Sequence, residues 1–97
     1  MFSREHILEQ LRLAKADLGQ QYNVRSMALF GSYSRNEQTD ASDVDVLVDF
    51  SVTPSGFTFV DFAESLEARL GLPVDVVPAD ALKPRHREFI QEELAYV

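Results

Sequence analysis

The sequence predicts an α+β fold, in which a small mixed β-sheet carries helices packed on it. Apolar residues recur at helical spacing in some segments, and three short apolar segments are typical of strands. The expected order is helix, strand, loop or short helix, strand, helix, strand and helix, with connections that do not require all strands to be parallel. The 97 residues are at the low end of the usual size for one domain. We therefore expect residues 1–97 to form a single domain with one modest core.

The N-terminal part of the chain predicts a helix followed by a buried strand. Ser3 suits the N-cap of a helix over residues 3–18, and Gly19 suits its C-terminal end. The apolar residues of this helix are Ile7, Leu11, Ala14 and Leu18. Residues 24–30 form a short apolar run that ends directly at Gly31, which favours a strand over a helix.

The second predicted strand has the clearest alternation in the sequence. It spans residues 43–50 and follows a loop or short helix over residues 32–42. Because successive side chains of a strand point to opposite faces, alternate residues of this strand lie on different faces of the sheet. One face carries Val44, Val46, Val48 and Phe50, and the other carries Asp43, Asp45, Leu47 and Asp49.

The second half of the chain predicts a helix, a strand and a last helical segment. A loop over residues 52–57 precedes a helix that Gly71 ends, and residues 73–77 form the third strand. The apolar stripe of the helix is Phe59, Phe62, Leu66 and Leu70. Asp80 is expected to cap the last segment, and Pro84 suits its first turn. The expected buried stripe of that segment is Phe89, Ile90 and Leu94.

The composition excludes several kinds of site and of protein. The chain has no cysteine, which excludes disulfides, thiolate zinc sites and cysteine nucleophiles. A net charge of −7 would repel a phosphate backbone, so we expect no stable direct binding to nucleic acid. The first residues include acidic side chains and no long apolar run, which argues against a signal peptide or a membrane span. The expected location is the cytoplasm.

Three aspartates are candidate metal ligands because each lies on or beside a predicted strand. Asp43 and Asp45 are two positions apart, so on one strand they point the same way with Cα atoms roughly 6.5 Å apart. Two adjacent carboxylates repel each other unless a cation or a proton lies between them. Their oxygen ligands favour Mg²⁺ or Mn²⁺ over softer metals. Asp75 lies alone in an otherwise apolar strand. The alternative is that Asp43 and Asp45 lie on the solvated face of an edge strand.

A second candidate feature is the Gly31-Ser32 pair directly after a strand. Glycine lets the backbone approach a ligand closely, and the start of a helix there would direct free N–H groups at an anion. The alternative is an ordinary turn with a serine cap. A phosphate site combined with carboxylates for metal is what phosphoryl or nucleotidyl transfer requires.

The stretch GSYSRNEQTDASDVD from Gly31 to Asp45 resembles the GSx₁₀DxD signature of the DNA polymerase beta-like nucleotidyltransferase superfamily. The resemblance covers nearly the whole chain and is closest to the minimal nucleotidyltransferase (MNT) group, so it implies that fold. It also implies site roles. Gly31 and Ser32 would contact a triphosphate, Asp43 and Asp45 would hold two Mg²⁺ ions, and Asp75 would complete the ion nearer the acceptor. Arg35 would steady the leaving phosphates.

The resemblance also implies a partner and a substrate. MNT domains are commonly the antitoxin half of a two-gene module with a HEPN-type toxin, so the chain would transfer AMP from ATP to a tyrosine of that toxin, as part of a hetero-oligomer or as a homodimer. An alternative is a non-catalytic antitoxin that inhibits its partner by direct binding. A third reading, a nucleotidyltransferase for small molecules, fits less well because such enzymes usually carry a further domain.

Overall fold

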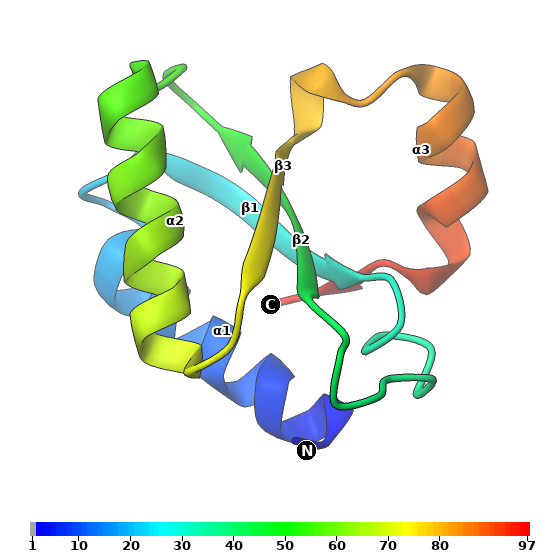
Figure 1. The fold of residues 1–97 in the computed structure, drawn as a ribbon. Coiled ribbons are helices and arrows are strands. Elements are labelled where there is room, and N and C mark those ends of the chain that lie inside the picture. Colours follow the sequence, from blue (N-terminus) through cyan, green and yellow to red (C-terminus); the bar gives the residue numbers. More distant parts are fainter. Residues whose placement is uncertain (1) are drawn as a thin grey trace.

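One mixed sheet with the strand order β3-β2-β1-β4 forms the centre of the computed structural model, which describes residues 2–97 (Figure 1). Its strands are β1 (Val24–Phe30), β2 (Val44–Phe50), β3 (Val74–Pro78) and β4 (Ala95–Tyr96). The β1 strand is antiparallel to both β2 and β4, whereas β2 and β3 are parallel. The predicted α+β class with a mixed sheet is confirmed.

Within residues 2–97, three α-helices and two short 3₁₀ helices precede or connect the strands. They are α1 (Arg4–Leu18), α2 (Gly56–Leu70), α3 (Pro84–Ile90), η1 (Ala79–Ala81) and η2 (Gln91–Glu93). The predicted caps of α1 and α2 are confirmed: the Ser3 side chain accepts a hydrogen bond from the His6 N–H, and Gly71 ends α2 in the left-handed region at φ 70°. None of the helices among residues 2–97 has both the length and the hydrophobicity needed to cross a bilayer.

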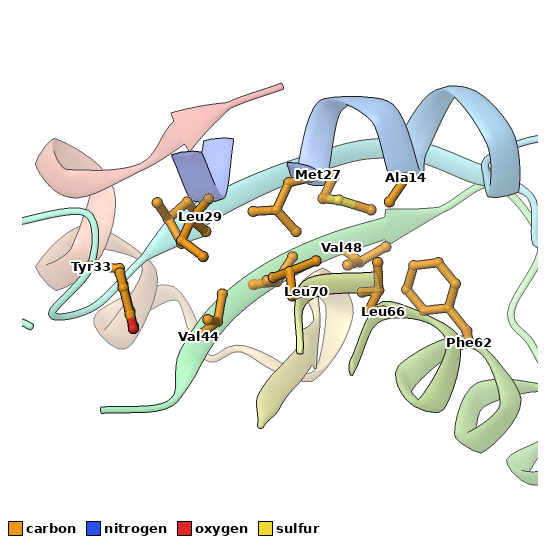
Figure 2. Close-up of a cluster of buried hydrophobic side chains, with 12 residues drawn as sticks. Ala14, Met27, Leu29, Tyr33, Val44, Val48, Phe62, Leu66 and Leu70 are labelled. Carbon is orange, nitrogen blue, oxygen red and sulfur yellow. The ribbon is translucent and has the colours of Figure 1, made fainter. Parts of the chain in front are cut away.

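The hydrophobic core lies between one face of the sheet and the helices α1 and α2 (Figure 2). The predicted alternation along β2 is confirmed, because its apolar set Val44, Val46, Val48 and Phe50 belongs to the core or packs against it. Tyr33, which follows β1, is also buried and packs in this cluster. The opposite face of the sheet is therefore the one that carries the alternate residues, including Asp45.

Several predicted boundaries need correction. The β2 strand begins at Val44, so Asp43 precedes it, and β3 begins one residue later than predicted. Residues 32–42 form turns and irregular structure, so the loop is confirmed and the alternative of a short helix is not. The α2 helix begins at Gly56, inside the predicted loop, because the Ser55 side chain caps it by accepting the Thr58 N–H.

The prediction for the C-terminal segment is partly wrong. Asp80 lies in η1 and does not cap α3, whose N-cap residue Lys83 makes no side-chain capping bond. Phe89 was predicted to be buried, yet 89% of it is exposed. The helix α3 has seven residues and lies away from α1 and α2, so it has little surface on which to bury a stripe (Figure 1). The β4 strand was not predicted, because two residues give no periodicity.

Candidate active site

The sheet places Asp45 and Asp75 side by side. Both lie at the same register of the parallel strands β2 and β3, where they are Cα partners. Adjacent strands are about 4.8 Å apart, and side chains at the same register point to the same face. Since Val44 and Val46 face the core, the two carboxylates lie on the face away from it. The family resemblance implied that these two aspartates share one site, and the strand register places them side by side.

Asp43 adds a third negative charge to this edge of the sheet. It lies directly before β2 and is exposed. The pKa of Asp45 is raised from 3.8 to about 6, mainly by burial and in addition by the negative charges of Asp75 and Asp43. The positive charge of Arg35 opposes this effect. The site is therefore a set of like charges, in which burial and the neighbouring carboxylates disfavour the ionised form of Asp45.

Gly31 brings the turn after β1 against these carboxylates. The last residue of β1, Phe30, pairs with Asp45 across the antiparallel ladder, so Gly31 follows directly at the same end of the sheet. Gly31 has φ 78°, a conformation in which a side chain is strained. A methyl group at its Cα would also overlap the Asp45 carboxylate. Glycine is thus needed here both for the backbone angle and for the close approach.

Of the two predicted alternatives for residues 32–42, a loop or a short helix, the structure has the loop. Its backbone is closed by hydrogen bonds from the Arg35 N–H to the Gly31 carbonyl (3.1 Å) and from the Glu37 N–H to the Ser32 carbonyl (2.9 Å). No helix follows among the described residues up to β2. The expectation that a helix start directs free N–H groups at an anion is therefore wrong for Gly31, whose N–H donates to a side chain.

That side chain belongs to Glu93, a residue that the sequence analysis missed. Its Oε1 accepts from the Gly31 N–H and its Oε2 from Arg35 Nη1, each at 3.0 Å. Arg35 Nε also donates to Glu37 at 2.8 Å. The Gly31 and Glu93 residues are 62 positions apart, and β4, which brings the chain end back to β1, gives no periodic signal. No local sequence pattern could have revealed this contact.

The residues present fit a hard divalent cation that binds together with a phosphate. Among residues 2–97, no three histidine or acidic side chains are gathered into a complete metal-binding group. Mg²⁺, however, is usually held by one or two carboxylates together with substrate phosphates, and not by a cage of protein ligands alone. Asp45, with its raised pKa beside two further aspartates, provides the oxygen ligands and the excess negative charge that such an ion would neutralise.

A cavity of about 560 Å³ lies elsewhere, between the N-terminal turn of α2 and the ends of β2 and β3. It is lined mainly by apolar side chains, with Asp49 and Asp80 at its wall, and none of the three candidate aspartates contributes. Asp49 forms an ion pair with Arg25 at 3.6 Å. The cavity is therefore separate from the carboxylate group.

Comparisons of this chain with a family model and with known proteins agree on one family. A model of the family described as "Nucleotidyltransferase domain" matches residues 11–97. The chain is similar to protein adenylyltransferase MntA of Thermococcus cleftensis, with 41% identity over 100% of this chain and 98% of that protein. It is also similar to a provisionally named protein adenylyltransferase of Methanocaldococcus jannaschii, with 45% identity over 94% of each chain.

Solved structures share the fold. A structure of a provisionally assigned minimal nucleotidyltransferase matches with a TM-score of 0.81 and 31% identity, covering 97% of this chain and 95% of that one. A complex of an MNT antitoxin with a tri-AMPylated HEPN toxin of Shewanella oneidensis matches with a TM-score of 0.69, covering 96% of this chain and 70% of the matched chain. At 18% identity, this second likeness concerns the fold alone.

Proposed function

The chain belongs to the nucleotidyltransferase domain family, and from this membership we propose that it is a protein adenylyltransferase that moves AMP from ATP to a hydroxyl group. The observation that carries the proposal is the position of Asp45, which lies beside Asp75 on the neighbouring strand and against Gly31 of the turn. This arrangement brings candidate metal ligands and a candidate phosphate-binding turn to one end of the sheet. Nucleotidyl transfer requires both.

Asp43, Asp45 and Asp75 would hold the divalent metal. We propose that this metal is Mg²⁺, bound as two ions, and that Mn²⁺ can substitute for it. When bound, such ions stabilise the negative charge on the attacking and leaving oxygens. The carboxylates would bind them in the ionised form. Because the pKa of Asp45 is raised to about 6, it is mostly ionised at neutral pH.

The remaining site residues would bind and orient the nucleotide. Gly31 and Ser32 form the turn that would contact the triphosphate, and Arg35, whose side chain is 44% exposed, would bind the leaving phosphates. In the reaction the acceptor hydroxyl oxygen forms a bond to the α-phosphorus, and the bond from that phosphorus to the bridging oxygen of pyrophosphate breaks. Asp75, exposed beside Asp45, would receive the hydroxyl proton.

We further propose that the acceptor is a tyrosine of a HEPN-type toxin, which makes the chain an antitoxin. Two findings support this proposal: relatives that align over nearly the whole chain are named protein adenylyltransferases, and a structure of the same fold is an MNT antitoxin in complex with an AMPylated HEPN toxin. Asp75 and Asp43 are both exposed, so the carboxylate site is open to an acceptor on another protein.

A labelling experiment tests this function. The pure protein is incubated with Mg²⁺, α-labelled ATP and a lysate that contains the product of the neighbouring gene. Transfer of label to that product supports the proposal. If the protein neutralises the product while no label is transferred from any of the four nucleoside triphosphates, the chain is a non-catalytic antitoxin that acts by binding.

A further inference from the structure

The Glu93 carboxylate holds two groups to which the proposed function assigns phosphate contacts. One oxygen accepts the Gly31 N–H and the other accepts Arg35 Nη1, each at 3.0 Å. The turn over residues 31–37, here called the glycine turn, contains both groups. It is thereby hydrogen-bonded at two points to one side chain near the other end of the chain. Neither the metal ligands nor the predicted phosphate contacts include this residue.

The backbone fixes the position of Glu93. It is the last residue of η2, and β4, which pairs with β1 through Ala95 and Tyr96, follows closely. Its carbonyl also accepts a hydrogen bond from the Ser34 hydroxyl in the glycine turn. The side chain is only 17% exposed, compared with 65% for Glu37, the other acid that pairs with Arg35. Both ion pairs of Arg35 are exposed on the arginine side and contribute little energy. Glu93 is the less exposed of the two acids and is held by backbone contacts, so it is the acid that offers Arg35 a fixed position.

We propose that Glu93 is a positioning residue for the triphosphate: by accepting from the Gly31 N–H and from the Arg35 guanidinium, it fixes the turn after β1 and the arginine relative to each other, and so sets the geometry in which Ser32 of the turn and Arg35 meet the nucleotide. This inference rests on the proposed nucleotidyl transfer. The two hydrogen bonds of Arg35 to acids use Nε and Nη1, which leaves Nη2 for a phosphate oxygen. The arginine can thus be held by Glu93 and bind a phosphate at the same time.

Electrostatics alone predicts the opposite effect of Glu93. Its negative charge adds to the carboxylate group, since it helps to raise the pKa of Asp45, and it would repel a triphosphate. A carboxylate that merely occupies the phosphate site would also weaken ATP binding, because it would compete with the phosphates for the same donors. Removal of the charge would then tighten nucleotide binding, whereas loss of a positioning residue weakens it. The sign of the change separates the two cases.

Two substitutions separate position from charge. Glu93→Gln keeps one oxygen for the Gly31 N–H, but its amide NH₂ cannot accept from Arg35. Glu93→Asp keeps the charge but is one methylene shorter, so it cannot span both donors. Glu92→Gln is the matched control, because it removes the same charge from the exposed neighbouring residue. Thermal unfolding of each variant checks that the fold is retained.

The test is a calorimetric titration with Mg²⁺ and α,β-methylene ATP, in which the bond that would be cleaved is blocked. Both Glu93→Gln and Glu93→Asp should weaken binding about tenfold, as loss of a charge-assisted hydrogen bond typically does. Glu92→Gln should bind like the wild type. In an Arg35→Gln background, Glu93→Gln should add less than about a twofold effect, because the two residues act as a unit.

Binding that is unchanged or tighter in Glu93→Gln, or a full additional loss in the Arg35→Gln background, would overturn the positioning role. In the transfer assay the same variants should raise KM for ATP more than they lower kcat. A wild-type protein that does not bind the analogue at all would overturn the proposed function itself. A wild type that binds, with a Glu93→Gln variant that binds equally well, overturns only the role of Glu93.

Discussion

Gly31 lies so close to Asp45 that a methyl group on its Cα would overlap the carboxylate oxygen Oδ2. Gly31→Ala should therefore displace Asp45 or the turn and reduce transfer by at least about 100-fold, since small misplacements of reacting groups are that costly. Because Gly31 has a positive φ, the alanine side chain should also lower the unfolding free energy by about 1–2 kcal/mol. Labelling rates and urea unfolding measure the two effects.

Gly71→Ala is the matched control for that substitution. Gly71 also has a positive φ, but no atom lies within 4 Å of the position that its Cβ would take. It should lose about 1 kcal/mol of stability and retain full transfer activity. Equal activity of the two variants would show that the contact between Gly31 and Asp45 does not matter for function.

The second prediction concerns the pH dependence of stability in the metal-free protein. The pKa of Asp45 rises from 3.8 to about 6 on folding, so the folded state holds its proton more tightly than the unfolded state. This contribution to stability is fully present below pH 3.8 and is lost as the pH rises through about 6. Because Asp45 is only partly buried, the effect is on the order of 1 kcal/mol.

Asp45→Asn isolates this effect from that of the other acids. In EDTA, its unfolding free energy should increase relative to the wild type as the pH is raised from 4 to 8, with the change centred between the two pKa values. Urea unfolding at several pH values measures it. A difference between the proteins that is constant over this range would contradict the electrostatic strain assigned to Asp45.

The third prediction is that Mg²⁺ and nucleotide stabilise the protein cooperatively. The carboxylates alone form no complete metal-binding group among the described residues, and phosphates would supply the missing ligands. Mg²⁺ with α,β-methylene ATP should add about 2.7 kcal/mol at a ligand concentration one hundred times Kd, and neither should do so alone. Thermal shifts measure this. An equal shift from nucleotide in EDTA would argue against metal-dependent binding.

The fourth prediction concerns the core that supports the site. Phe62 is fully buried on α2 and contacts the rings of Tyr22 and Phe50. Phe62→Ala should cost about 3–5 kcal/mol of unfolding free energy. Phe57 lies on the same helix but is 90% exposed, so Phe57→Ala should change stability by less than about 0.5 kcal/mol. A comparable loss in both variants would contradict the assigned core.

Periodic patterns explain what could be predicted from the sequence. The helical spacing of Ile7, Leu11 and Ala14 and the alternation of Val44, Val46 and Val48 each report a buried face, and the structure confirms both faces. The apolar patterns also placed Asp45 and Asp75 in strands, whereas the family resemblance alone implied that they belong to one site. Their exact register depends on the parallel pairing of β2 with β3, which no local pattern encodes.

The rest depends on contacts between distant residues. The role of Glu93 requires that the chain end return to β1 through a strand of only two residues. The exposure of Phe89 likewise follows from where α3 lies, and not from its apolar character. Both features are decided by tertiary placement, which a single sequence without periodicity does not reveal.

The most direct test of nucleotidyl transfer compares ATP labelled at the α-phosphate with ATP labelled at the γ-phosphate, using the purified protein, its partner and Mg²⁺. Label from the α-position should appear on the partner with the wild type and with Asp49→Asn, which alters the same strand outside the carboxylate group. It should be absent with Asp45→Asn. Transfer of the γ-label, or undiminished transfer by Asp45→Asn, would contradict the proposed reaction and the site assigned to it.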